Sequence, residues 1–418
     1  MSVKTSFQRK IKVLRALGKR RLILLPFAYI YVVIILGLSR VIQVNILEVP
    51  NDRLGHFATN TELSYLNFIE NQKSSHVVKK NICCVTSTVS CNTQLETMWR
   101  RVLKIKTGEF GWLVNDLCRR LTRQDFYLKS DNCDIKGLLS IYPPTLHFTE
   151  CEERIGSNFL KNCGVASPEK LVCLNVRDNA YLSETKALTW NKSRDWSYHN
   201  YRNAEIREFR ASAETLAHLG YSVFRMGSIV KDQLNSTSSN VIDYATNGMR
   251  TDFLDVFLGA KCKFCVSTGS GWDSVPQIFR RPSLYVNFLP YFSPEVLVRD
   301  VTVFPKLILD KTSGSLLRFR DLIFRDIFGV YNTHEYHDAG VVIRDLSSEE
   351  LVEAVTEMAQ RVEGTFVETP EQKEMQAKLK RILSTHPQLQ PSPNYYPIRA
   401  QFASCFLSRY PNFLDGLD

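Results

Sequence analysis

Apolar runs of strand length alternate along the chain with stretches in which apolar residues recur at helical spacing. The runs occupy residues 41–50, 81–89, 171–176, 221–227, 261–267 and 282–288. Helical spacing is clear in residues 57–69, 92–105, 203–220 and 251–260, and the third of these carries Ile206, Phe209, Ala213, Leu216 and Ala217 on one face. Strand and helix alternating in this way predict parallel sheets covered by helices on both faces, so we expect an α/β protein.

The alternation falls into two blocks. A helical pattern at residues 152–164 closes the first block, and the next strand pattern begins at Leu171. In the second block we expect Thr251 to cap a helix, and Ser347-Ser-Glu-Glu350 has the form of a capping box that begins a late helix. We therefore expect four parts, which are residues 1–40, 41–165, 166–362 and a helical tail, 363–418.

The first part combines a basic arm with an uncharged apolar segment. Residues 22–38 contain seventeen consecutive uncharged residues, with Pro26 near the start. A membrane span needs roughly 20 apolar residues, with a lower limit of about 17. Because the first strand pattern follows at once, we expect a shallow segment on the cytoplasmic face of the inner membrane, peripheral or monotopic. The alternatives are a single-pass helix, which the positive-inside rule would orient with the N-terminus in the cytoplasm, and a buried core helix.

The charge distribution favours a membrane surface over nucleic acid. The chain has a net charge of +10, and residues 1–21 contain eight basic residues and no acidic one. The remaining chain is nearly neutral, with 45 basic and 43 acidic residues. A basic end beside an apolar segment is typical of binding to anionic lipid, whereas a nearly neutral body argues against a nucleic-acid partner, so we expect none.

The cysteines predict neither a disulfide framework nor a zinc site. There are eleven of them, scattered through a long chain, and two are adjacent, Cys83 and Cys84. Cys262 and Cys265 have zinc-like spacing, but no second Cys or His pair accompanies them. We therefore expect reduced and mostly buried thiols.

Polar residues at strand ends are the candidate ligand contacts, because ligands of parallel sheets collect at the carboxyl edges of the strands. One such loop follows the strand pattern 261–267 and contains Thr268, Gly269, Ser270 and Gly271, with Ser274 as a possible helix cap. Its glycines, hydroxyls and helix start are suited to holding a phosphate. A turn with no ligand is the alternative interpretation.

Charged residues follow three other strand patterns. Arg177 and Asp178 come after residues 171–176, and Arg225 lies at the end of residues 221–227. They either meet a polar ligand or form ion pairs between loops. In the first block, Asp52 and His56 lie between the first strand and the first helix. If the two blocks face each other, these loops would line a shared cleft.

Several segments resemble a little-characterised family of bacterial glycosyltransferases associated with surface polysaccharide and lipopolysaccharide assembly. They are "DRLGHFATNTEL" (52–63), "NVRDNAYL" (175–182), "YHNYRNAEI" (198–206), "GYSVFRMG" (220–227), residues 249–288 and "SSEELVEAVTEM" (347–358). The resemblance implies the GT-B fold, in which two Rossmann-like domains hold the acceptor in the first and the nucleotide sugar in the second. "NVRD" and the Ser/Thr-Gly turn are also similar, more loosely, to GDP-fucose-using fucosyltransferases, but the chain has Arg-Asp where those enzymes have paired arginines.

Glycosyl transfer requires stabilisation of the departing diphosphate. No Asp-x-Asp motif occurs in the chain, so we expect no divalent metal and no other cofactor. We assign stabilisation of the leaving group to Arg177, Arg225 and the turn Thr268–Gly271, and we expect Asp178 to be a further contact of the donor. His56 is the preferred general base, since its ordinary pKa is near neutrality, and Asp52 is the other candidate. Tyr198, His199, Arg202 and Asn203 are expected to contact donor or acceptor.

Two functions from other classes fit parts of the same pattern. A sugar-nucleotide epimerase of the same fold would have the sheets and the phosphate loop but no need of a membrane segment. A non-catalytic scaffold for polysaccharide assembly would have the segment but no need of charged strand ends.

Overall fold

The computed structural model describes residues 19–38, 44–73, 80–121, 127–128, 132–165, 167–185, 197–291, 293, 296, 298, 300–389 and 398–417. The chain divides into two compact units. The first contains residues 1–132 and 145–147, and the second contains residues 133–144 and 148–418. Each unit has its own parallel sheet, so the predicted α/β class is confirmed.

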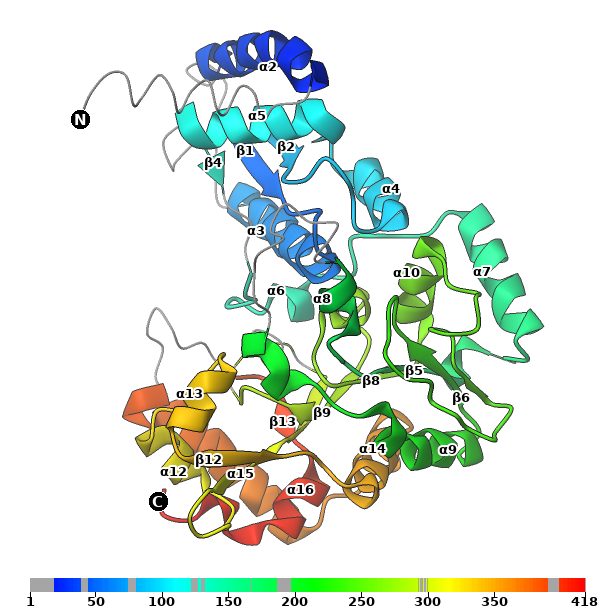
Figure 1. Cartoon of the computed structure of the whole chain (residues 1–418), viewed down its shortest axis with the longest axis vertical. Coiled ribbons are helices and arrows are strands. Elements are labelled where there is room, and N and C mark those ends of the chain that lie inside the picture. Colours follow the sequence, from blue (N-terminus) through cyan, green and yellow to red (C-terminus); the bar gives the residue numbers. More distant parts are fainter. Residues whose placement is uncertain are drawn as a thin grey trace. The chain divides into compact units, whose positions relative to one another are not determined.

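The first unit is built on a four-stranded sheet in the order β3-β2-β1-β4, with parallel neighbours throughout. The strands are β1 (Val44–Val49), β2 (Lys80–Val85), β3 (Ile105–Lys106) and β4 (Tyr127–Leu128). The helices are α2 (Lys19–Leu38), α3 (Thr61–Lys73), α4 (Thr93–Val102) and α5 (Gly108–Leu121). Figure 1 shows α5 and α3 on opposite faces of this sheet.

Helix α2 contains the apolar segment expected from the sequence, and it has two different faces. Ala28, Val32 and Ile35 are buried and lie in one cluster with Leu113 and Cys118 of α5. The opposite face of α2 is exposed and apolar. The helix is therefore part of the core of the first unit on one face and exposed on the other.

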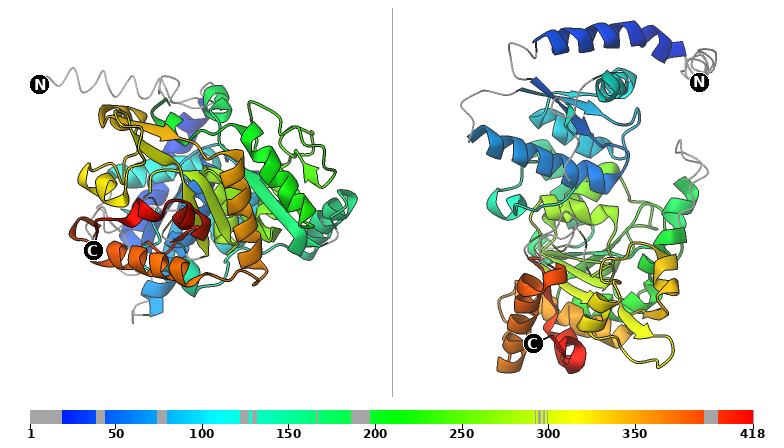
Figure 2. Two further views of the ribbon diagram at one scale, coloured as in Figure 1. Left: turned by 90° about the horizontal axis from the view of Figure 1, so that it is seen from below. Right: turned by 90° about the vertical axis from the view of Figure 1, so that its left-hand side faces the viewer.

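The second unit contains a seven-stranded parallel sheet in the order β13-β10-β9-β8-β5-β6-β7. Its strands are β5 (Leu171–Asn175), β6 (Ser222–Met226), β7 (Val241–Ile242), β8 (Phe264–Ser267), β9 (Ser283–Phe288), β10 (Val301–Pro305) and β13 (Gln401–Phe402). A separate antiparallel pair joins β11 (Leu307–Asp310) and β12 (Val341–Arg344). Figure 2 gives two further views of the whole chain, in which this unit carries the green to red colours.

Helices surround the sheet of the second unit. They are α6 (Leu138–Ile141), α7 (Glu150–Asn162), α8 (Ala180–Thr185), α9 (Arg210–His218), α10 (Asp252–Lys261), α11 (Ser274–Ile278), α12 (Phe319–Phe324), α13 (Thr333–Asp338), α14 (Ser348–Val362), α15 (Pro370–Thr385) and α16 (Ser404–Arg409). Two predicted caps are confirmed. The Thr251 side chain accepts from Leu254 N at 3.1 Å, and Ser347 forms a complete capping box with Glu350.

Helix α7 belongs to the second unit, whereas the sequence pattern had placed residues 41–165 together. A Cβ at Gly156 of α7 would lie 2.2 Å from the ring of Phe257, so the helix backbone lies directly against α10. The Lys261 Nζ atom also lies 2.7 Å from Glu153 Oε1. These contacts join residues about a hundred positions apart in the sequence. A local pattern of strands and helices therefore does not show where one unit ends and the next begins.

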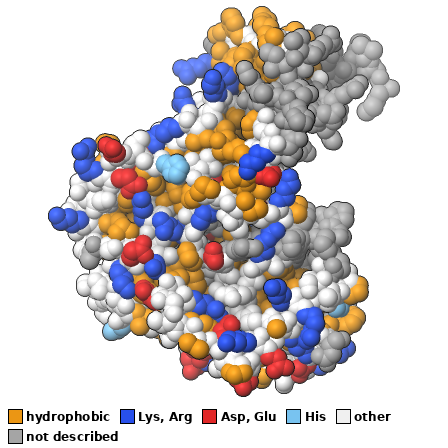
Figure 3. Space-filling model, turned by 180° about the vertical axis from the view of Figure 1, so that it is seen from behind, with side chains coloured by type: hydrophobic (Ala, Val, Ile, Leu, Met, Phe, Trp, Pro, Cys, Tyr) orange, Lys and Arg blue, Asp and Glu red, His pale blue; other side chains and the backbone are white. Residues whose placement is uncertain are grey.

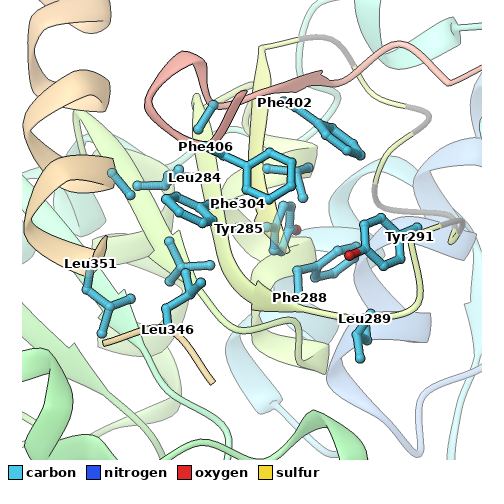
Figure 4. Packing of buried hydrophobic residues seen from close by; sticks show 14 of the residues in the cluster. Leu284, Tyr285, Phe288, Leu289, Tyr291, Phe304, Leu346, Leu351, Phe402 and Phe406 are labelled. Carbon is cyan, nitrogen blue, oxygen red and sulfur yellow. The ribbon is translucent and has the colours of Figure 1, made fainter. Parts of the chain in front are cut away.

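Residues after 362, expected to form a tail, extend the second unit's sheet and core. Strand β13 pairs with β10, and the buried Glu357 of α14 accepts from Ser404 N at 2.9 Å and Cys405 N at 2.7 Å. Figure 4 shows Phe402 and Phe406 beside Phe304 in the hydrophobic core. The C-terminal segment is therefore part of the domain that it follows.

Candidate functional site

The centre of the larger sheet brings two of the predicted loops together. Strands β5 and β8 are neighbours, and Asn175 at the end of β5 is paired with Ser267 at the end of β8. Beyond them, Thr268 N donates to Asn175 O at 3.1 Å and Arg177 N donates to Thr268 Oγ1 at 2.9 Å. The Arg177 loop and the Thr268 loop are thus joined at the carboxyl edge of the sheet, where ligands of parallel sheets bind.

A buried carboxylate organises the Thr268–Gly271 loop from within. Asp273 is 1% exposed, and its Oδ1 accepts from Asn175 Nδ2 at 2.7 Å and from Ser267 Oγ at 2.6 Å. Its Oδ2 accepts from Ser270 N, and Ser270 Oγ accepts from Trp272 N at 3.2 Å. Ser270, rather than the expected Ser274, is therefore the cap of the short helical turn η5 (Gly271–Asp273).

These hydrogen bonds change the interpretation of the loop as a phosphate cradle. The amide of Gly269 donates to Ser267 Oγ at 3.1 Å, and the amides of Thr268, Ser270 and Trp272 already have the acceptors given above. Three of the four amides of the predicted cradle, those of Thr268, Gly269 and Ser270, are therefore already bonded inside the protein. The loop is better suited to holding neighbouring cationic side chains in place.

Arg202 is one such side chain. Its Nη2 donates to Gly269 O at 2.8 Å. Gly269 has φ of +84°, and a Cβ there would lie 2.9 Å from the Phe288 ring, so glycine is required at this position. The loop backbone thereby has a fixed carbonyl with which it orients the guanidinium of Arg202.

The segment that carries Arg202 is anchored at two further points. It is the helical turn η3 (Ser197–Arg202), and Thr333 Oγ1 donates to Tyr198 O at 2.9 Å and accepts from Tyr201 N at 3.2 Å. After the turn, the buried Lys306 donates from Nζ to Asn203 O at 2.6 Å. Tyr198, His199, Arg202 and Asn203, expected to contact a ligand, therefore belong to one clamped segment, and Arg202 adjoins the Gly269 loop.

Arg177 forms no contact-distance ion pair among the described residues, although the charges of Asp273 and Asp178 act on it from farther away. The structure gives its side chain no ion pair there, and its Nε is buried with no hydrogen-bond partner in that part of the chain. Burial, followed by repulsion from the charge of Arg202, lowers the pKa of Arg177 to about 10. The residue is still protonated at neutral pH. Two nearby guanidinium groups are stabilised by a bound anion, which relieves their repulsion.

Arg225 and Asp178, also predicted as donor contacts, have structural partners. Arg225 is 0% exposed, and it donates from Nη1 to Asp243 Oδ1 at 3.1 Å and from Nη2 to Asp232 O at 3.0 Å. Asp178 accepts from Ala180 N at 2.8 Å and from Lys231 N at 2.9 Å. Arg225 therefore forms the ion pair that was the alternative interpretation of a charged strand end. Asp178 instead joins two loops through hydrogen bonds to their backbone amides.

Asp52 and His56 lie in the first unit, after β1. Both side chains are exposed. The preceding Asn51 is buried and exchanges two hydrogen bonds with the Ser87 backbone, with Oδ1 accepting at 2.8 Å and Nδ2 donating at 3.1 Å. This exchange ties the loop after β1 to the loop after β2, and so fixes the backbone from which Asp52 and His56 project.

His56 begins a π-helical turn, η1 (His56–Asn60), which leads directly into α3. Neighbouring protein atoms partly desolvate the imidazole, and this desolvation lowers the pKa of His56 below its ordinary value. The charge of Arg53 lowers the pKa further, whereas the charge of Asp52 raises it. The ring is therefore neutral at pH 7 and can accept a proton. Single π-turns inside helices are frequent at functional sites.

Among the described residues, the structure shows neither a metal-binding cluster nor a disulfide. Within the described segments, no group of three or more His, Cys, Asp or Glu side chains could hold a metal ion. All eleven cysteines are free thiols, and Cys262 and Cys265 are buried. Burial raises the pKa of the Cys83 thiol to about 12, so this thiol is unreactive at neutral pH.

The structure also identifies residues that the sequence analysis missed. Asn175, Asp273 and Lys306 are buried polar residues that hold the two loops and the Arg202 segment. Asn175 carried a signal, because it is an amide that ends an otherwise apolar strand pattern. Lys306 carried none, since it acts on a residue 103 positions away.

No protein-family model and no curated protein sequence matches the chain significantly. Among solved structures, the chain is similar to E. coli ADP-heptose LPS heptosyltransferase II, with 14% identity and a TM-score of 0.43 over 76% of this chain and 99% of that one. It is similar to the glycosyl transferase family 9 protein from Veillonella parvula DSM 2008, with 12% identity and a TM-score of 0.43 over 76% and 97%. The E. coli heptosyltransferase WaaC with ADP-2-deoxy-2-fluoro heptose gives 12% identity and a TM-score of 0.28 over 62% and 92%. None of these three is a fucosyltransferase.

Proposed function

We propose that this protein is a glycosyltransferase that moves a sugar from a nucleotide-diphosphate sugar to a glycan or lipid-linked acceptor in surface polysaccharide biosynthesis. The observation that carries the proposal is the pair of guanidinium groups, Arg177 and Arg202, beside the Gly269 loop at the carboxyl edge of a parallel sheet. Such a pair is suited to a ligand with two or more negative charges, and a diphosphate supplies them.

The chemistry that follows is displacement of a nucleoside diphosphate from the sugar. The departing oxygen gains negative charge in the transition state, and fixed cations stabilise that charge without rearrangement. Arg202 is fixed by Gly269 O, and the Arg177 backbone is fixed by Thr268 Oγ1 and by Ala204 N, which donates to Arg177 O at 3.0 Å. We do not assign this role to Arg225, because its guanidinium forms an ion pair with Asp243.

In the same proposal, His56 removes the proton from the acceptor hydroxyl. A base must be unprotonated at the working pH, and the lowered pKa of His56 satisfies that condition. The first unit would then bind the acceptor and the second unit the donor, as the resemblance noted in the sequence implies.

The proposal is tested with a panel of labelled nucleotide sugars and a membrane extract as the acceptor source. We expect transfer of label to a glycan or lipid with one donor, and slow hydrolysis of that donor when acceptor is omitted. Conversion of the donor to an epimer would identify a sugar-nucleotide epimerase instead. A folded protein that neither binds nor turns over any donor would indicate a scaffold.

Replacing Arg177 with methionine should weaken binding of the donor's nucleoside diphosphate by about 10- to 100-fold, because a charge-assisted hydrogen bond contributes about 1.5–3 kcal/mol. Binding of the bare nucleoside should not change. The measurement is calorimetric titration of both ligands into each variant. Arg207→Met is the matched control, since Arg207 is an exposed arginine of the same unit with its side chain 78% accessible. Equal losses for diphosphate and nucleoside would contradict the assignment.

Chelation should leave turnover unchanged. The expectation rests on the absence of Asp-x-Asp from the sequence and on leaving-group stabilisation by Arg177 and Arg202. Initial rates are measured in excess EDTA, in magnesium and in manganese after removal of bound metal, and they should agree within about twofold. A rate that disappears in EDTA and returns with metal would overturn the cationic leaving-group model.

A further inference from the structure

One face of helix α2 is an exposed apolar stripe that its own domain does not cover. Within the described part of the chain, α2 is the one helix long and apolar enough to cross a membrane, over residues 20–38. The exposed stripe follows helical spacing through residues 23, 27, 30 and 34, and its members are Ile23 (67% exposed), Phe27 (62%), Ile30 (56%) and Ile34 (54%). Figure 3 shows hydrophobic side chains gathered at the top of the view, over this helix.

The opposite face of α2 is committed to packing inside the first unit. Val32 is fully buried in a cluster with Leu113 and Val114 of α5. Tyr31 meets Phe110 edge to face with ring centroids 5.6 Å apart, and the Arg21 guanidinium lies 4.5 Å from the centroid of the Trp112 ring. A helix held in this way leaves only one side for another partner.

The helix beneath α2 is too polar to enter a bilayer with it. The last turns of α5 carry Asp116, Arg119 and Arg120, with Asp116 carboxylate oxygens 2.9 Å and 2.8 Å from the two guanidinium groups. Both arginine side chains are about three-fifths exposed, at 60% and 59%. If α2 crossed the hydrocarbon core while still packed against α5, these charged side chains would have to approach the hydrocarbon core. Placing charges there has a large free-energy cost.

We propose that α2 lies in the plane of an anionic membrane surface, with Ile23, Phe27, Ile30 and Ile34 inserted among the lipids and the Val32 face held by α5. Charge complementarity identifies the occupant as anionic lipid. Eight basic residues precede the stripe and no acidic residue does, so the flanking sequence attracts phosphate headgroups. A stripe of isoleucine and phenylalanine beside a basic arm is the composition that interfacial helices share. This inference does not depend on the proposed glycosyl transfer.

Vesicle binding tests the surface. The full chain is mixed with vesicles of phosphatidylethanolamine and phosphatidylglycerol or of phosphatidylcholine alone, and the bound fraction is measured by sedimentation. We expect binding to the anionic vesicles, reduced by high salt, and at least about tenfold weaker partitioning for the double variant Phe27→Glu/Ile34→Glu. The matched control is Phe324→Glu, because Phe324 of α12 is an equally exposed phenylalanine, at 64%. That control should bind as the wild type does.

Topology separates a helix in the plane from a helix that spans. The full chain carries one epitope at each terminus, and proteinase is added to sealed spheroplasts and then to lysed ones. A helix in the plane of the cytoplasmic face leaves both epitopes protected until lysis. Loss of the C-terminal epitope alone from sealed spheroplasts would show a spanning helix and would overturn the proposal.

The remaining alternative is a second copy of the chain on the same stripe. If a second copy covers the stripe, sedimentation velocity without lipid should show a dimer for the wild type and a monomer for the double variant. That result, together with no vesicle binding, would overturn the lipid assignment. Equal melting temperatures of wild type and variants confirm that the exposed substitutions leave the fold intact.

Discussion

Replacing His56 with glutamine is expected to lower kcat by about 10²- to 10⁴-fold, the usual contribution of a positioned general base. Glutamine retains a polar side chain of similar length but cannot accept the proton of an acceptor hydroxyl. His56 is exposed, and the backbone hydrogen bonds of its turn do not involve the ring, so the variant should remain folded. Donor hydrolysis in the absence of acceptor should be affected much less than transfer. Unchanged transfer by the folded variant would remove His56 from the mechanism.

The pH profile gives a second and independent readout of the same residue. Because the neutral ring is the active form, kcat/KM should fall as the pH decreases through the His56 pKa, which lies below its ordinary value. Arg53 lowers this pKa, so Arg53→Gln should move the acidic limb to higher pH. Asp52 raises it, so Asp52→Asn should move the limb to lower pH. General damage to the fold cannot explain two neighbouring substitutions that shift the acidic limb in opposite directions. If neither substitution shifts the limb, the limb reports the titration of a group other than His56.

Replacing Arg225 with alanine is expected to lower the free energy of unfolding by about 3–5 kcal/mol, since breaking a buried ion pair leaves the other charge uncompensated. Arg225 is fully buried, and its removal takes a partner from Asp243 and from the carbonyl of Asp232. The measurement is equilibrium unfolding in urea. Arg207→Ala is the control, because an exposed arginine paired only with a sequence neighbour should change stability by less than about 0.5 kcal/mol.

The same variant decides between the two roles of a charged strand end. At a temperature where Arg225→Ala is still folded, it should bind the donor's nucleoside diphosphate with the wild-type preference over the bare nucleoside. A variant of normal stability that has lost this preference would restore Arg225 to the donor site. Loss of stability with the preference retained would confirm the structural role that the Asp243 contact indicates.

Local physical chemistry allowed much of the fold to be predicted from the sequence. Strands β5, β6, β8 and β9 lie within the predicted apolar runs, because a strand buried on both faces requires nearly continuous apolar side chains. The caps at Thr251 and Ser347 were equally predictable, since each bonds to a backbone amide three residues later. Strands β3, β4, β7 and β13 have two residues each, which is too short for any pattern, and they were missed. The longer strands β10, β11 and β12 were missed as well.

The candidate site was predicted in part. That the loops after β5 and β8 share one edge of the sheet follows from the rule for parallel strands, and the Arg177 and Thr268 loops do meet there. The rule does not say what each loop does with its amides. Asp273 takes the Ser270 amide through the folded turn, so fewer of the loop's amides are open to a phosphate than the sequence pattern suggests.

By itself, the sequence of this protein determined where the central strands of each sheet lie, where several helices begin, and which strand ends carry charge, because each depends on neighbours a few residues apart. Only the tertiary structure decided which charges are available. Arg225 and Arg177 both end apolar strand patterns, yet Arg225 meets Asp243 while Arg177 has no ion-pair partner in the described structure and lies near Arg202. Arg202 reaches Gly269 across 67 positions of sequence, and α2 has one face buried and one exposed because α5 covers only one side. Such contacts join residues far apart in the chain, so no local pattern of apolar and polar positions contains them.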